Sequence, residues 1–199
     1  MRTKALLITL ASLLPIGIAS TVPQVQLPFE MKSSSPSPLL SLTDLLTRSK
    51  NSRIFYDYLR DSSSVSTRLA NPLESTTILA PVNSAIIALE RRPHQGPPEP
   101  AGGYVQGYAG SRQDEQERAD YLEKWIKRHL IAGKVDLEEE SKEYESLLGG
   151  DKVSFARKDQ EGQAGYKVMP GDVQVVEIEQ ASNGVIFYLQ GTLNLDTVD

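Results

Sequence analysis

Residues 76–86 read Thr-Thr-Ile-Leu-Ala-Pro-Val-Asn-Ser-Ala-Ile and predict a strand that stops and continues as a helix. Ile78 and Leu79 favour a strand, whereas Pro81 has no amide hydrogen to donate to a continuing sheet. Asn83 can accept hydrogen bonds from the free amides at the start of the helix that follows. We therefore expect a strand, a sharp corner and an asparagine-capped helix in direct succession.

Further helices are predicted from the spacing of apolar residues on both sides of this segment. A short helix begins near Leu39, where Ser41 or Thr43 can cap it. The apolar residues of a second helix lie one turn apart, at Ile54, Phe55, Tyr58 and Leu59. Residues 117–130 predict a long amphipathic helix whose apolar face places Trp125 in the core.

Four strands are predicted late in the chain, at residues 152–156, 166–169, 173–178 and 185–189. The last two strands flank Asn183-Gly184, a pair that favours a tight hairpin because both residues tolerate positive φ. Helices come mainly early and strands mainly late. This order favours an α+β fold over an alternating α/β fold.

The chain is expected to have three parts. Residues 1–20 are typical of a secretory signal peptide, with a basic start, an apolar run and small residues before the cleavage position. A membrane anchor is the alternative, but a spanning helix needs about 20 apolar residues and Pro15 interrupts this run. Residues 21–38 are rich in proline and serine and predict a disordered leader. The folded domain is expected to cover residues 39–199.

An insertion rich in proline and glycine is expected within the folded domain, at residues 91–116. These residues interrupt regular structure and predict a loop, although a loop of this length is unusual in a compact domain. One interpretation is a tolerated surface insertion. The other is a partner-binding loop in which Tyr104 and Tyr108 are exposed aromatic contacts.

Charge and composition exclude several classes of function. The formal net charge is −5, and a negative protein is repelled by nucleic-acid phosphates and by anionic lipid. We therefore expect no nucleic-acid partner and no stable membrane insertion once the signal peptide is removed. The chain contains no cysteine, which excludes thiol nucleophiles and cysteine-based metal sites. Stability must come from core packing.

Histidine-based catalysis would depend on His94 or His129, the two histidines of the chain. His129 follows Trp125 by one helical turn on the apolar face, so we interpret it as a core histidine that makes a hydrogen bond. No Gly-x-Ser-x-Gly motif supports a serine hydrolase. The protein is expected not to be an enzyme, and a lumenal hydrolase that uses His129 is the alternative.

Metal and cofactor sites are not expected. Two histidines far apart in the sequence do not predict a zinc site. The acidic residues between positions 136 and 143 could attract calcium, but they lack the spacing and the central glycine of an EF-hand loop. We interpret them as a solvated surface. The chain also lacks a glycine-rich nucleotide-binding motif.

Three blocks of the sequence together resemble the signatures of fasciclin-like domains. Residues 77–86 resemble the first signature, residues 121–135 the central histidine-containing region, and residues 177–193 the second signature, which contains Asn-Gly. The blocks follow one another in the expected order. The positions that depart from the family pattern are Val82, Arg128, Glu177, Phe187 and Gln190.

This resemblance implies a fasciclin-like wedge of β-sheet flanked by several α-helices. It also implies a non-catalytic adhesion or interaction module whose partner is a protein or a glycan, such as a cell-wall polysaccharide. The expected location is the secretory pathway, with the protein secreted, at the cell surface or in a vacuole, and the pattern is most similar to single-domain fungal members. The candidate binding residues are Tyr104, Tyr108 and His129.

Overall fold

The computed structural model describes residues 39–98, 112–139, 142–160 and 163–193. In these ranges the helices are α1 (Leu42–Arg48), α2 (Arg53–Asp61), α3 (Ser63–Ala70), α4 (Asn83–Ile87), the 3-10 helix η1 (Pro93–Gln95) and α5 (Arg112–Arg128). The strands are β1 (Thr76–Pro81), β2 (Leu130–Ala132), β3 (Glu143–Glu145), β4 (Lys152–Gln160), β5 (Gln163–Met169), β6 (Val173–Ala181) and β7 (Gly184–Leu189).

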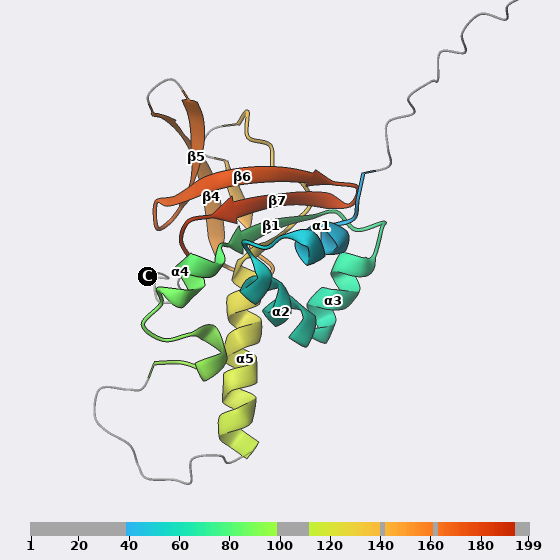
Figure 1. The fold of residues 1–199 in the computed structure, drawn as a ribbon, viewed down its shortest axis with the longest axis vertical. Helices are drawn as coiled ribbons and strands as arrows, with labels where there is room; N and C mark the ends of the chain where they lie inside the picture. Colours follow the sequence, from blue (N-terminus) through green and yellow to red (C-terminus); the bar gives the residue numbers. More distant parts are fainter. Residues whose placement is uncertain (1–38, 99–111, 140–141, 161–162, 194–199) are drawn as a thin grey trace, which may run out of the picture. The chain divides into compact units, whose positions relative to one another are not determined.

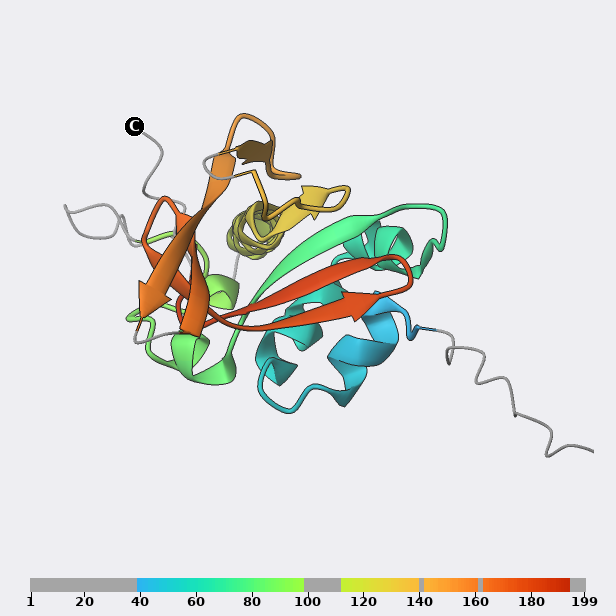
Figure 2. The same ribbon diagram turned by 90° about the horizontal axis from the view of Figure 1, so that it is seen from above.

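The strands form one sheet with the order β2-β1-β7-β6-β5-β4-β3. Figure 1 shows β1, β7 and β6 side by side. β1 and β7 are parallel, whereas the other neighbouring strands pair in antiparallel fashion. Seen from above, β4 and β5 turn away from the direction of β1, β6 and β7, so the sheet curves towards a barrel (Figure 2). The predicted α+β fold, a β-sheet flanked by helices, is confirmed.

The parallel pair β1 and β7 separates two hydrophobic cores. On one face, Ile78 and Ile186 pack with apolar residues of α1, α2, α3 and α5. On the other face, Leu79 and Phe187 pack with residues of β4, β5 and β6. In Figure 2, the blue helix α1 and the teal helix α2 lie on the opposite side of β7 from the orange strand β4. Strands with both faces covered are expected to have uninterrupted apolar sequences, as these two do.

The β6–β7 hairpin forms where it was predicted, but its turn differs from the prediction. Ala181 pairs with Gly184, and neither Asn183 nor Gly184 has a positive φ. Asn183 is buried, and its side chain accepts a hydrogen bond from the Leu42 amide (2.9 Å) and donates one to the Leu69 oxygen (2.9 Å). These contacts, which join the hairpin to α1 and α3, give Asn183 a role that the turn prediction missed.

Asn83 also differs from its predicted role. Val82, not Asn83, occupies the cap position of α4, and Asn83 is the first residue inside that helix. Its side-chain oxygen accepts a hydrogen bond from the Ile54 amide (3.0 Å), and its side-chain nitrogen donates to the Lys50 oxygen (2.8 Å). Because the side chain of Ser52, the cap residue of α2, does not bond to the amides at the start of that helix, Asn83 caps α2 from a distant part of the chain.

Substituting Asn83 by alanine should lower the free energy of unfolding by about 1–2 kcal/mol, because the start of α2 loses its capping partner. A thermal melt measures the effect. Ser84→Ala, at the exposed neighbouring position, is the matched control and should leave the midpoint unchanged. Equal midpoints for the Asn83 variant and the control would contradict the capping role.

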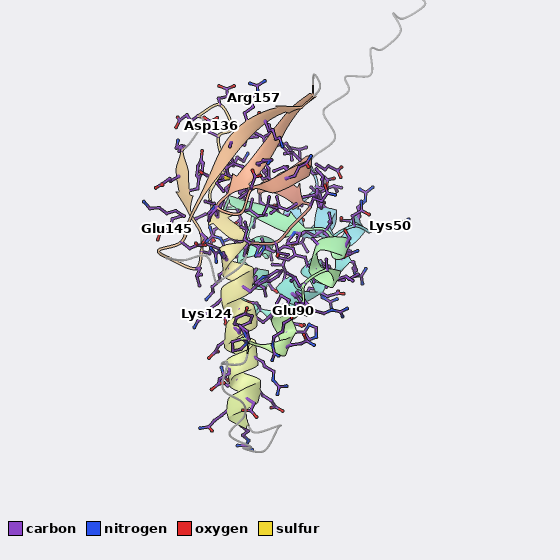
Figure 3. The ribbon with its side chains drawn as sticks, turned by 90° about the vertical axis from the view of Figure 1, so that its left-hand side faces the viewer. Lys50, Glu90, Lys124, Asp136, Glu145 and Arg157 are labelled. Carbon is purple, nitrogen blue, oxygen red and sulfur yellow. The ribbon has the colours of Figure 1, made fainter. Side chains whose placement is uncertain are left out.

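The loop predicted at residues 91–116 is shorter than expected, because both ends have regular structure. At one end, the Arg91 side chain donates to the oxygens of Gln95 (2.8 Å) and Gly96 (3.1 Å) around η1. At the other end, α5 begins at Arg112 instead of residue 117. The first turns of α5 project away from the sheet (Figure 3). Tyr104 and Tyr108 lie outside the described residues.

Candidate functional site

His129 lies directly after α5, and both of its ring nitrogens are bonded inside the protein. Nδ1 is 2.8 Å from the Trp125 backbone oxygen, and the Leu193 amide donates to Nε2 over 3.2 Å. A carbonyl oxygen only accepts and a backbone amide only donates, so the neutral ring must carry its proton on Nδ1. The side chain has no exposed surface. His129 therefore joins the end of α5 to the segment that follows β7.

Aromatic rings surround His129 on the helical side of the sheet. The Trp125 and Phe55 ring centres lie 4.2 Å and 5.6 Å from that of His129. Burial lowers the pKa of His129 to about 4, the hydrogen bond to Trp125 opposes this shift, and the nearby charge of Arg128 lowers the pKa further. A general base must reach a substrate proton, and this ring cannot do so in the folded protein. Because the ring is buried, it also cannot contact a binding partner directly in the folded protein.

Acidification should destabilise the protein through His129. Above the ordinary pKa of 6.5 the ring is neutral in both the folded and the unfolded state, so protonation of His129 causes no loss of stability there. Between pH 6.5 and about 4 the unfolded chain takes up a proton that the folded protein does not, so stability falls as the pH falls. We expect a loss of roughly 3 kcal/mol by pH 4 from this residue.

Denaturant unfolding at pH 7 and at pH 4.5 measures this dependence, with His129→Gln and His94→Gln compared with the unaltered protein. The difference in stability between the two pH values should shrink in the His129 variant and persist in the His94 variant. The same pH dependence in all three proteins would refute the assignment. His94 lies on η1, and its Nδ1 is 2.7 Å from the Tyr58 hydroxyl.

A buried ion pair lies beside His129. Arg128 Nε is 3.0 Å from Asp151 Oδ2, and the two side chains are only 1% and 6% exposed. The pair joins the end of α5 to the start of β4. Although the sequence marked Arg128 as a departure from the family pattern, it held no local signal for its partner 23 positions away. The geometry gives the pair a structural role.

A groove of about 440 Å³ lies where β1 and β7 end. It is lined by Asn51, Val82, Asn83, Ser84, Val176 and Gln190. The break at Pro81 builds one wall, because the Val82 amide donates to the Leu189 oxygen (2.9 Å) and the Asn83 amide to the Asn51 oxygen (2.6 Å). The corner after Pro81 was predicted from the sequence. The groove itself was not, because residues far away in the chain form its other walls.

The described residues lack the features needed for a metal site and for crossing a membrane. Among them, no three histidine or acidic side chains are grouped so that they could hold a metal ion. The helices within the same ranges lack the length and apolar character needed to cross a bilayer.

A model of the fasciclin domain matches residues 50–194. The chain belongs to the fasciclin domain family. It is 34% identical over 163 residues to a FAS1 domain-containing protein of Neurospora crassa, and 31% identical over 166 residues to one of Aspergillus fumigatus. These matches cover 77% and 82% of this chain but only 64% and 66% of the relatives, so the chain spans about two thirds of their length.

A solved fasciclin structure is similar as well. It is a FAS1 domain pair from the insect cell adhesion molecule Fasciclin I, with a TM-score of 0.55, 15% identity and coverage of 79% of this chain and 51% of that chain. At this identity the similarity shows the fold. The fasciclin domain is an adhesion and interaction module, and domains of this family are generally non-catalytic. Within this fasciclin domain, Arg128 and His129 both lie in the core.

Proposed function

We propose that the protein is a non-catalytic adhesion or interaction module of the secretory pathway that binds a protein or an extracellular polysaccharide. The observation that carries this proposal is the fasciclin match over residues 50–194. The geometry of His129 supports the non-catalytic part, because a buried ring with both nitrogens bonded cannot act as the base of a hydrolase.

The secretory location rests on the signal peptide predicted at residues 1–20 and the leader predicted at residues 21–38. Expression with a carboxy-terminal tag, followed by fractionation into medium, wall, vacuole and cytosol, tests it. We expect the tagged protein in one of the first three fractions, with a mass reduced by loss of the signal peptide. Full-length protein in the cytosol would contradict the proposal.

The partner-binding role predicted for the insertion is tested by capture from medium and wall fractions. Tyr104→Ser and Tyr108→Ser together should reduce recovery of the partner at least about fivefold, because aromatic contacts dominate the energetics of many interfaces. These two substitutions are preferable to deleting the whole insertion, because η1 packs against α5. Tyr56→Ser, outside the insertion, is the control. Unchanged recovery would reject the tyrosines as the contact, and no recovery with any variant would reject the proposed function.

A further inference from the structure

We propose that the groove at the ends of β1 and β7 binds a segment of an uncharged oligosaccharide. This inference rests on the proposed function, because it selects a glycan as the partner of the interaction module. Three features of the groove support it, namely the chemistry of its walls, hydrogen-bonding groups that the described protein does not use, and its size.

Within the part of the chain that the structure describes, the walls of the groove carry no charged side chain, although 24% of the residues in the chain are charged. Its polar groups are the carboxamides of Asn51, Asn83 and Gln190 and the hydroxyl of Ser84. Each of these groups can both donate and accept hydrogen bonds, as sugar hydroxyls do. The Val82 and Val176 side chains add apolar surface that suits the C–H faces of a sugar ring. This composition favours a neutral and polar ligand.

Hydrogen-bonding groups in the groove differ in how the protein uses them. The Asn83 side chain is hydrogen-bonded to backbone groups of Ile54 and Lys50, and these bonds hold this wall of the groove in place. The exposed side chains of Asn51, Ser84 and Gln190 make no hydrogen bond to the rest of the described structure. They are therefore available to a ligand without the loss of an internal contact. A wall held in place before binding also reduces the entropy lost when the ligand binds.

Size and surroundings distinguish a sugar from a peptide. A volume of about 440 Å³ is in the usual range for small-ligand sites, roughly 300–1,000 Å³. An extended peptide could instead pair with β6, whose residues beyond Val175 pair with β7 and not with β5. That part of the strand carries Glu177 and Glu179, so such a peptide would have to be basic and its binding would weaken with salt. The uncharged walls favour the sugar.

Titration of the protein with defined hexasaccharides tests the inference. The probes are hexasaccharides of β-1,3-linked glucose, β-1,4-linked N-acetylglucosamine and α-1,6-linked mannose. Binding is measured by calorimetry and by NMR of the valine methyl groups. For at least one probe we expect binding that shifts the Val82 and Val176 methyl signals and is equally strong at about 0.05 M and about 0.5 M salt. Ser84→Ala combined with Gln190→Ala should weaken this binding about fivefold or more.

The matched control combines Gln180→Ala with Ser182→Ala, which removes the same two residue types from exposed positions outside the groove. It should bind like the unaltered protein, and thermal melts should show both double variants folded. No binding of any probe, or equal binding by the two double variants, overturns the inference. Capture of a basic peptide that depends on Ser84 and Gln190 overturns it too. In each of these cases the proposed function fails only if the intact protein also captures no protein or wall polysaccharide.

Discussion

Gly184→Ala should lower the free energy of unfolding by at least about 3 kcal/mol, the upper part of the range for overpacking a core. A Cβ atom at this position would lie 1.9 Å from the Thr76 backbone oxygen and 2.8 Å from Leu42 Cδ1. Thr76 is the register partner of Gly184, so its carbonyl belongs to the sheet and cannot move alone. Either β1 and β7 separate at this end, or α1 lifts from the sheet.

Thermal and denaturant unfolding measure this loss, which corresponds to a fall in midpoint of roughly 10 °C for a domain of this size. Gly165→Ala is the matched control, because Gly165 is also a strand glycine without positive φ and its added Cβ would lie 3.2 Å from the Lys158 oxygen. We expect the control to cost less than about 1 kcal/mol. A midpoint for Gly184→Ala equal to that of the control would show that the strands do not approach so closely.

Gly184 illustrates which features the sequence could predict. The Asn-Gly pair identified the hairpin, since turn residues carry a local signal. It did not identify the reason for the glycine, which is the approach of Thr76 from more than 100 positions earlier in the chain. Helix α1 was predictable in the same local way, because the Ser41 side chain accepts from the Asp44 amide as a cap should. Features fixed by neighbours in the sequence were recovered.

Elements fixed by distant partners were missed. β2 was not predicted, and Leu130, its first residue, was predicted as the end of the long helix because it continues the apolar pattern. It forms a strand by pairing Leu130 with Ile78 of β1. β3 lies at the edge of an acidic segment interpreted as solvated, and it exists because Glu145 pairs with Lys152 of β4. The groove follows the same rule, because its residues come from several separate segments.

Asp151→Ala is expected to lower the free energy of unfolding by about 3–5 kcal/mol, because it removes a carboxylate that lies 3.0 Å from the buried Arg128 guanidinium. Glu143→Ala is the matched control. Glu143 forms an ion pair of similar length with Lys152 (2.8 Å), but those two side chains are more than 60% exposed. Exposed pairs contribute at most about 1 kcal/mol, so the control should change little. Urea unfolding at neutral pH compares the two variants.

A second substitution separates lost charge compensation from lost packing. If the cost of Asp151→Ala comes from the uncompensated guanidinium, adding Arg128→Met should recover part of the stability, because the buried charge is removed as well. If the cost comes from packing alone, the double variant should be less stable than either single variant. That second result would contradict the ion-pair explanation. Partial recovery of stability in the double variant would show that Asp151 stabilises the protein mainly by compensating the charge of Arg128. It would also show that an apolar pair could join α5 to β4 at this position.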